Sequence, residues 1–224
     1  MKKIGFAVAL EAELTDFLNA FKNAEIIKKG AYSVIFVKSG EKELYVLKTG
    51  VGEISAAAAT QFLITAFNVE AIINFGVCGK INPKYKLLDT AAIKSVVHYR
   101  FDTSAVDGVP AGTYDGFKTP YIPADEKLLS VLRSVCPNIK LAICASGDKF
   151  VGDDDTKKYL KQTFNADVCE MEAAGVLITA SRNGVPVLMV KSVSDDCDGF
   201  DFNEYVKSAA KMHTEIILKL INAL

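Results

Sequence analysis

Residues 43–79, ELYVLKTGVGEISAAAATQFLITAFNVEAIINFGVCG, contain the pattern on which the fold prediction depends. Glu43–Thr49 favours a β-strand, and the alanine-rich run after Gly50-Val51-Gly52 predicts a long helix over about residues 53–67. Ala71–Phe75 is wholly apolar, which predicts a short buried strand that stops at Gly76-Val77-Cys78-Gly79. A strand, a helix and a second strand in this order indicate an α/β fold.

Outside this unit, apolar runs of strand length alternate with amphipathic runs of helical length. Further strands are predicted at Lys3–Ala9, Ala31–Val37, Leu88–His98, Ile139–Ala145, Asp167–Cys169 and Pro186–Ser192. Further helices are predicted at Glu13–Phe21, 171–182 and Asn203–Leu220, and one more after the capping residues Gly152–Asp155. We therefore predict one α/β domain over residues 1–224, with a central mixed β-sheet flanked by helices.

The composition narrows the possible partners and the compartment. A formal net charge of -1 gives no electrostatic reason to expect nucleic acid or an anionic membrane as a partner. No apolar run reaches the roughly 18 residues that a membrane-spanning helix needs. Five cysteines, an odd number without a C-x-x-C pair, are typical of reduced thiols. These features predict a cytoplasmic protein.

Acidic residues follow three of the predicted strands. The three pairs are Glu11 and Glu13, Glu170 and Glu172, and Asp195 and Asp196. Ligands of open α/β sheets bind at the carboxyl ends of strands, and converging carboxylates are costly to bury without a ligand or a proton to transfer. Helix capping is the simpler explanation for any one pair, but three pairs together favour a functional site.

Other constellations of reactive residues are weak. The two histidines, His98 and His213, lie far apart in the sequence and give little support to a Ser-His-Asp or Cys-His site. No spacing of histidine, cysteine and aspartate suits a structural zinc ion. Gly50-x-Gly52 after a strand is only half of a dinucleotide fingerprint. We therefore expect neither a metal nor an organic cofactor.

Five segments resemble a known family. ASGDKFV (145–151), CEMEAAG (169–175) and SVSDD (192–196) resemble the nucleoside phosphorylase superfamily. Their spacing, together with AVALEAEL near the start and TGVGEISAAAA at 49–59, is similar to that of the methylthioadenosine/S-adenosylhomocysteine nucleosidases. The resemblance implies a nucleoside phosphorylase-like fold and hydrolysis of the N-glycosidic bond of an adenine nucleoside, with a small-molecule nucleoside as the partner.

The resemblance also implies the catalytic roles. Asp195 would protonate the five-membered-ring nitrogen of the departing purine, and Ser194 would orient its carboxyl group. Glu172 would accept hydrogen bonds from the ribose 2′ and 3′ hydroxyls, while Glu13 would hold and polarise the attacking water. Bond cleavage develops positive charge on the sugar, which nearby carboxylates stabilise.

The remaining implied contacts concern the sugar and the base. Met171 would pack on the ribose, Phe150 would stack on the base, and the backbone of Val151 would bind the edge of adenine. Glu170, the first glutamate of Glu-Met-Glu, is included among the substrate-binding residues, as are Val77 and Lys191. At the last two positions the family usually has serine and often has arginine, respectively.

Water is favoured over phosphate as the nucleophile. The three arginines are Arg100, Arg133 and Arg182, and none lies in the segments where related phosphorylases hold phosphate. Glu13 would repel an anion. A purine nucleoside phosphorylase, a futalosine-type nucleoside hydrolase and a non-catalytic nucleoside-binding protein remain as alternatives.

The stretch Tyr99–Pro123 is rich in glycine and proline, and it predicts a long irregular loop. Its position resembles that of the loop through which the family's dimer partner covers the 5′ end of the substrate. Val106, Pro110 and Tyr114 are the apolar candidates for that pocket. The resemblance therefore implies a homodimer.

Overall fold

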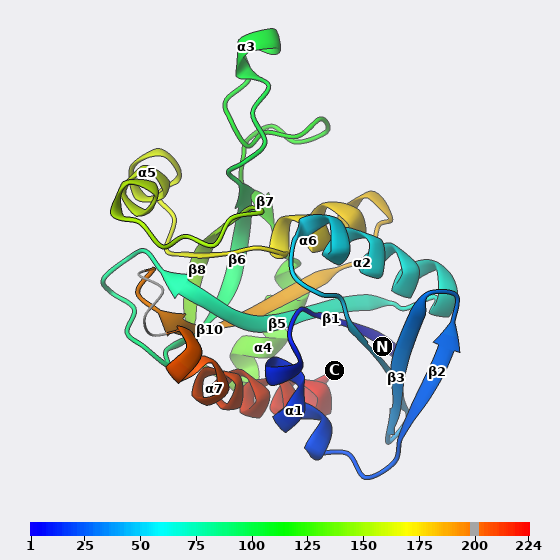
Figure 1. Cartoon of the computed structure of the whole chain (residues 1–224). Helices are drawn as coiled ribbons and strands as arrows, with labels where there is room; N and C mark the ends of the chain where they lie inside the picture. The colour runs from blue at the N-terminus through cyan, green and yellow to red at the C-terminus, as the bar shows by residue number, and fades with distance from the viewer. Residues whose placement is uncertain (198–201) are drawn as a thin grey trace.

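Residues 1–197 and 202–224, the part of the chain that the computed structural model describes, form ten strands and seven helices (Figure 1). The strands are β1 (Lys3–Val8), β2 (Ala24–Lys29), β3 (Tyr32–Ser39), β4 (Lys42–Lys48), β5 (Ala71–Lys80), β6 (Thr90–His98), β7 (Ile122–Pro123), β8 (Lys140–Ser146), β9 (Val168–Glu170) and β10 (Val187–Asp195). The helices are α1 (Glu11–Asn19), α2 (Glu53–Phe67), α3 (Ser104–Asp107), α4 (Glu126–Val135), α5 (Asp154–Phe164), α6 (Ala173–Arg182) and α7 (Phe202–Ala223). The predicted α/β class is confirmed.

All ten strands belong to one mixed sheet. Its order is β10-β6-β8-β9-β5-β1-β4-β3-β2, with β7 attached to β6, and β10 also pairs with β5. The extra pairing closes β5, β9, β8, β6 and β10 into a ring, while β1 to β4 extend from it as an open sheet. Closure removes free edges on that side and leaves β2 as an exposed edge strand.

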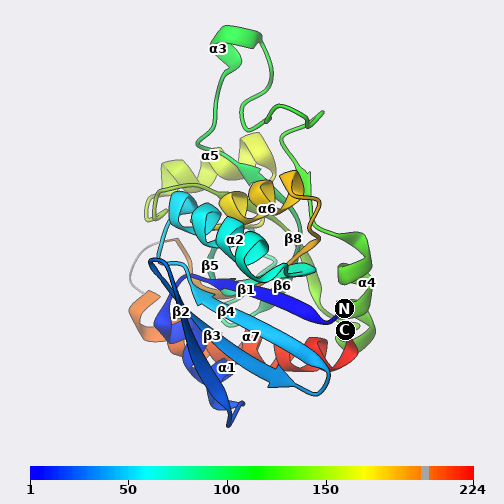
Figure 2. The ribbon, with the colours of Figure 1, turned by 90° about the vertical axis from the view of Figure 1, so that its right-hand side faces the viewer.

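Helices cover both faces of the sheet. Helices α2 and α6 lie together on one face, and α1, α4 and α7 lie on the other (Figure 2). Each face has its own apolar core: Leu63 of α2 and Leu177 of α6 belong to one cluster, and Phe17 of α1 and Ile217 of α7 belong to the other. Because both faces are covered, the central strands are buried and largely apolar; in β5 only Asn74 and Lys80 are polar.

Parallel pairing brings the ends of three strands to one place. β1 pairs in parallel with β5, and β5 pairs in parallel with β10. Their carboxyl ends therefore meet at the same edge, with Glu13 just after β1, Gly79 near the end of β5 and Asp195 at the end of β10. This edge is where a ligand site is expected in such a sheet.

The main error of the sequence prediction concerns β5. The strand does not stop at Gly76 but continues through Val77, Cys78 and Gly79 to Lys80. Gly76 is needed for close approach rather than for a turn, because a Cβ there would lie 2.5 Å from Glu13 Oε1. A glycine can thus mark a packing contact inside a strand as well as its end.

Other elements were predicted with shifted bounds or not predicted. Helix α2 covers the predicted residues 53–67, and Asp153 caps α5 by accepting a hydrogen bond from the Thr156 amide at 2.7 Å. Strand β2 and helix α4 have no counterpart in the prediction. β2 is mostly exposed and lacks a buried face, so it gives no apolar pattern.

The glycine- and proline-rich stretch protrudes from the body of the molecule. It carries the short helix α3 at its tip and returns to the sheet through β7 (Figures 1 and 2). The prediction of a long irregular loop is confirmed for most of its length. Of the helices in the described residues, none is long and apolar enough to span a bilayer.

Candidate active site

A pocket of about 260 Å³ opens where the carboxyl ends of β1, β5 and β10 meet. We call it the site pocket. Of the candidate residues, Glu13, Val77, Phe150, Val151, Glu170, Met171, Glu172, Ser194 and Asp195 line it. Segments separated by more than a hundred residues in the sequence thus supply one cavity, as the strand-end rule predicts.

Glu13 is fixed by two backbone amides. Its Oε2 accepts a hydrogen bond from the Leu10 amide at 2.9 Å, and its Oε1 accepts one from the Val77 amide at 2.8 Å. The residue is only 3% exposed, and burial raises the pKa of its carboxyl group although the Lys191 ammonium opposes this. A carboxylate held in this way has one orientation and retains lone pairs for a further donor.

Asp195 ends β10 with its carboxyl group held on both sides. The Ser194 hydroxyl donates to Oδ2 at 2.8 Å, and the Cys197 amide donates to Oδ1 at 2.9 Å. A Cβ on Gly79 would lie 2.9 Å from Oδ1, so only glycine leaves room for this side chain. Asp195 is 2% exposed and faces the site pocket.

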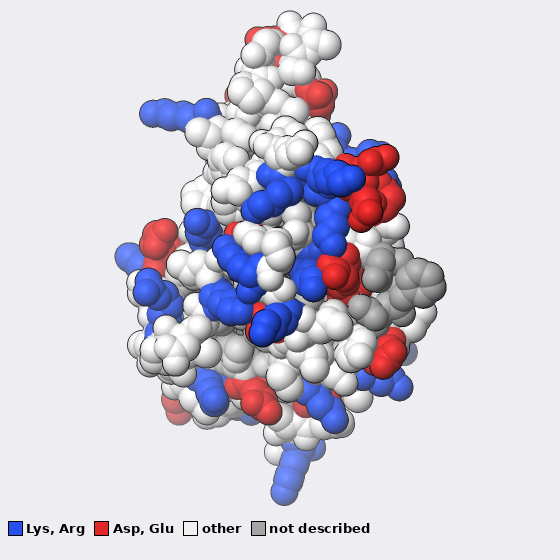
Figure 3. Space-filling model, turned by 90° about the vertical axis from the view of Figure 1, so that its left-hand side faces the viewer, with Lys and Arg blue, Asp and Glu red and all other residues white. Residues whose placement is uncertain are grey.

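Its neighbour Asp196 has a different environment. Asp196 is paired at the surface with Lys157 at 2.6 Å and Lys80 at 3.2 Å. Figure 3 views the side of the molecule on the left of Figure 1, where Lys and Arg side chains gather with Asp and Glu among them. Of the two aspartates, only Asp195 lines the site pocket.

The Glu-Met-Glu segment places two carboxyl groups side by side. Glu170 accepts hydrogen bonds from the amides of Glu172 and Ala173 at 3.1 and 3.0 Å, and the Lys191 ammonium lies 3.0 Å from its Oε2. Glu172 accepts a hydrogen bond from the Gly52 amide at 2.9 Å. Lys191 is 2% exposed and does not line the site pocket; it lies behind Glu170 as its counter-ion.

These contacts shift the two glutamates in opposite directions. Burial would raise the pKa of Glu170, but the Lys191 ammonium and the donated hydrogen bonds outweigh it and hold the pKa below its ordinary value. Burial and the adjacent Glu170 raise the pKa of Glu172 to about 8. At neutral pH the Glu-Met-Glu segment therefore combines a charged carboxylate with a protonated carboxyl group, which reduces their mutual repulsion.

Apolar groups form the outer wall of the site pocket. Phe150 is 45% exposed, and its ring meets that of Phe202 edge-on with centroids 5.6 Å apart. Val151 is buried beside it, and Met171 lies on the segment between the two glutamates. Phe202, the first residue of α7, carries no motif that would have identified it, and Leu10, Val51 and Lys149 were missed as well.

The loop candidates lie away from this cavity. Val106 is 91% exposed on α3, and Pro110 is also exposed. Tyr114 is half-buried and its hydroxyl lies 2.6 Å from His98 Nδ1 of the same chain. None of the three lines the site pocket among the described residues, so their role at a partner's site stays a prediction.

Comparison with known proteins agrees with the fold. The model of the phosphorylase superfamily matches residues 3–222. An aminodeoxyfutalosine nucleosidase from Campylobacter jejuni is 31% identical, with all of both chains covered. A 5′-methylthioadenosine/S-adenosylhomocysteine nucleosidase from Staphylococcus haemolyticus is 28% identical over 99% of this chain and 100% of its own.

A solved structure supports the same assignment. The structure of the Helicobacter pylori 5′-methylthioadenosine/S-adenosylhomocysteine nucleosidase superimposes with a TM-score of 0.95 at 27% identity, over 100% of this chain and 99% of that one. The resemblance predicted from the sequence motifs is therefore confirmed at the level of the family. This chain belongs to the phosphorylase superfamily, and the relatives named above are nucleosidases.

Proposed function

We propose that this chain is an N-ribosyl hydrolase that cleaves the glycosidic bond of an adenine nucleoside and releases adenine and the ribosyl moiety. The observation that carries the proposal is the convergence of Glu13, Glu172 and Asp195 on one pocket. Each of the three is less than a tenth exposed and has its carboxyl group held by backbone or hydroxyl donors. Burying three acidic groups is costly, so their arrangement indicates a chemical task.

Asp195 acts as the general acid. As the bond between C1′ and the purine nitrogen breaks, its electrons move to the purine, which is a poor leaving group as an anion. The proton of Asp195 neutralises it, and a positioned acid of this kind contributes about 10² to 10⁴ in rate. The Ser194 hydroxyl on Oδ2 and the Cys197 amide on Oδ1 fix the direction of transfer.

Glu13 acts on the water. Its oxygens are held by the Leu10 and Val77 amides, so the carboxylate is oriented before substrate binds. Water adds through oxygen to C1′ as the positive charge develops there, and Glu13 takes the proton that the water releases. The proton lost by Asp195 and the proton gained by Glu13 balance the reaction.

Glu172 binds the sugar, and aromatic groups bind the base. Glu172 accepts hydrogen bonds from the ribose 2′ and 3′ hydroxyls, with Met171 packed against the ring. Phe150 stacks on adenine, and its edge contact with Phe202 supports that surface. The Val151 backbone binds the edge of the base.

The lining charges favour water over phosphate. Among the described residues that line the site pocket, Lys149 is the one cation, and arginine is absent. A phosphate dianion would face Glu13 instead of the bidentate donors that arginine supplies. A phosphorylase therefore fits the pocket less well than a hydrolase.

The proposed function includes substrates with different groups at the 5′ position. Relatives that cover the whole chain are named for aminodeoxyfutalosine and for 5′-methylthioadenosine or S-adenosylhomocysteine. Both substrate classes share adenine and ribose and differ beyond the 5′ carbon. We include both, with Val77 and Lys191 as the departures most relevant to preference.

A homodimer in the cytoplasm belongs to the same proposal. The five cysteines are all free, which suits a reducing compartment. In a dimer, the protruding loop with Val106, Pro110 and Tyr114 would reach the partner's substrate near the 5′ position.

A substrate panel tests the proposal. The purified protein is incubated with 5′-methylthioadenosine, S-adenosylhomocysteine, aminodeoxyfutalosine, adenosine and inosine, each with and without phosphate. We expect free adenine and a reducing sugar without phosphate, and the rates rank the 5′ groups. A sugar phosphate formed only with phosphate would replace the hydrolase with a phosphorylase, and tight binding without cleavage would indicate a non-catalytic binding protein.

A further inference from the structure

A chain of buried hydrogen bonds runs beside the site pocket and is not part of the chemistry described so far. Glu53, the first residue of α2, has its Oε1 bound by the Ser146 hydroxyl at 2.9 Å and its Oε2 bound by His98 Nε2 at 2.6 Å. The other ring nitrogen of His98 lies 2.6 Å from the Tyr114 hydroxyl. We call Tyr114, His98 and Glu53 the relay.

The relay is placed by the sheet. His98 ends β6 and Ser146 ends β8, and the two residues are register partners in the parallel pair β6–β8. Ser146 is in turn the register partner of Glu170 on β9. The relay therefore lies at the same edge of the sheet as the site pocket, with Ser146 one strand and His98 two strands beyond the Glu-Met-Glu segment.

Glu53 touches the sugar-binding carboxylate through the backbone. The amide of the preceding residue, Gly52, donates to Glu172 Oε1 at 2.9 Å. Gly52 has a φ of +100°, a conformation that glycine adopts readily, and the next amide, that of Glu53, is held by Asp148 Oδ1 at 2.7 Å. A rotation of the Glu53 backbone would move the Gly52 amide away from Glu172.

A second contact links the Glu53 side chain to the helix that follows Glu172. The Ser146 hydroxyl that binds Glu53 also accepts a hydrogen bond from the Ala174 amide at 3.0 Å, in the first turn of α6. Glu172 is the residue at the start of that helix. At Gly175 the two helices touch so closely that a Cβ would overlap the Glu53 carbonyl group.

The far end of the relay belongs to the protruding loop. Tyr114 stacks on Phe101 with ring centroids 4.0 Å apart, and both rings stack on His98, the last residue of β6, which is the base of the loop. The loop carries α3 at its tip (Figure 1). The Glu53 and His98 side chains are 9% and 15% exposed. Buried polar groups that satisfy one another specify one arrangement, so a displaced loop base would disturb Glu53.

We propose that Glu53 and His98, together with Tyr114, are positioning residues that hold the Gly52 amide against Glu172 and so make the site discriminate ribosides from 2′-deoxyribosides. This inference rests on the proposed role of Glu172 as the group that binds the ribose hydroxyls. The relay also connects that carboxylate to the loop, so a contact made at the loop base reaches the sugar. It touches neither the bond that breaks nor the water.

The test compares two substrates that differ by one hydroxyl. The values of kcat/KM for adenosine and 2′-deoxyadenosine are measured for wild type, Glu53→Gln, His98→Gln and Tyr114→Phe. We expect each variant to lose about tenfold on adenosine and less than about twofold on 2′-deoxyadenosine, because a misplaced Glu172 matters only when the 2′ hydroxyl is present. Glu172→Gln should give the same collapse of the ratio.

Tyr121→Phe is the matched control. Tyr121 lies in the same glycine- and proline-rich stretch as Tyr114, and its hydroxyl donates to the Phe164 carbonyl at 3.2 Å, outside the relay. Its ratio of the two substrates should equal that of wild type. If Glu53→Gln or His98→Gln fails to fold, Tyr114→Phe carries the test, because it removes one hydroxyl from a half-buried ring.

The possible failures are distinguishable. Equal losses on both substrates, or no loss, in an active enzyme would overturn the relay while leaving the hydrolase intact. If wild type cleaves no adenine nucleoside of the substrate panel, the proposed function fails. Wherever adenosine and 2′-deoxyadenosine are not cleaved, their dissociation constants, measured by calorimetry, test the relay by the same ratio, and a ratio in the variants that equals that of wild type would overturn it.

Discussion

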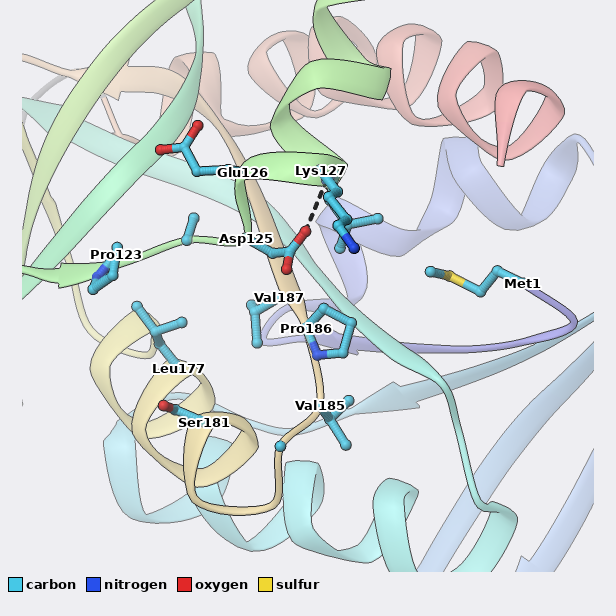
Figure 4. Close-up of a pocket in the computed structure, with 13 residues that line it drawn as sticks. Met1, Pro123, Asp125, Glu126, Lys127, Leu177, Ser181, Val185, Pro186 and Val187 are labelled. Carbon is cyan, nitrogen blue, oxygen red and sulfur yellow. Dashed lines mark hydrogen bonds between the residues drawn. The ribbon is translucent and has the colours of Figure 1, made fainter. Parts of the chain in front are cut away.

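The two ends of β10 open into two different pockets. Asp195, at its carboxyl end, lines the site pocket of about 260 Å³. Val187, at its beginning, lines a second pocket of about 520 Å³ between α4, α6 and Met1, which we call the distal pocket (Figure 4). The distal pocket has the larger volume, yet the two pockets differ in the burial and the hydrogen bonding of the charged groups that line them.

Charged groups in the distal pocket have ordinary structural tasks. The Asp125 carboxylate accepts a hydrogen bond from the Leu128 amide at 2.9 Å and caps α4, while Glu126 and Lys127 are exposed beside it (Figure 4). In the site pocket, Glu13 and Asp195 are 3% and 2% exposed. Buried carboxyl groups that are held in one orientation therefore indicate which end of the sheet carries the functional site.

The two pockets should differ most when one aspartate in each is replaced by asparagine. We expect Asp195→Asn to lower kcat by about 10² to 10⁴, because the amide cannot protonate the leaving purine. Asp125→Asn should leave kcat unchanged, since asparagine also caps helices well. Steady-state kinetics measure kcat for both variants, and circular dichroism verifies that they are folded. Near-native turnover of Asp195→Asn would refute the assignment of Asp195 as the general acid.

Replacing one lysine near each pocket should also change the free energy of unfolding by different amounts. Lys191→Met leaves the buried Glu170 without its counter-ion, and we expect a loss of about 3–5 kcal/mol in the free energy of unfolding. Lys127→Met at the exposed edge of the distal pocket should change it by less than about 0.5 kcal/mol. Urea denaturation measures both, and equal effects would show that Lys191 is not a required partner.

The raised pKa of Glu172 predicts a dependence of stability on pH. The folded state holds a proton up to about pH 8 that the unfolded state releases near 4.5, so raising the pH between these values favours unfolding. Glu172→Gln cannot titrate, and its stability relative to wild type should rise with pH by up to about 1.4 kcal/mol per unit. Urea midpoints from pH 5 to 8 test this, with the exposed Glu126→Gln as a control; parallel curves for wild type and Glu172→Gln would contradict it.

The smallest expected effect concerns the cap in the distal pocket. Asp125→Ala removes the acceptor for the Leu128 amide and should cost about 1 kcal/mol in the free energy of unfolding. The kinetic constants should not change. Thermal melting combined with an activity assay checks both parts, and an altered KM would mean that the distal pocket communicates with the site.

Local sequence patterns were sufficient to predict much of the fold and the main acidic residues of the site. The helix at residues 53–67 was predicted because its composition and bounding glycines act locally, and the strand-end rule grouped Glu13, Glu172 and Asp195. The continuation of β5 through Gly76 was missed because it results from pairing with β10 and β9, which lie far away in the chain. The same holds for the position of Lys191 behind Glu170, which results from the packing of β10 against the neighbouring strands.

The most direct test traces the oxygen atom that is added to the released sugar. An accepted adenine nucleoside is cleaved in ¹⁸O-labelled water with phosphate present, and the products are analysed at once by mass spectrometry. Unlabelled sugar product kept in labelled water corrects for exchange. We expect one ¹⁸O atom in the released sugar, together with free adenine and no sugar phosphate. A sugar phosphate without the label would contradict the central claim that this site activates water.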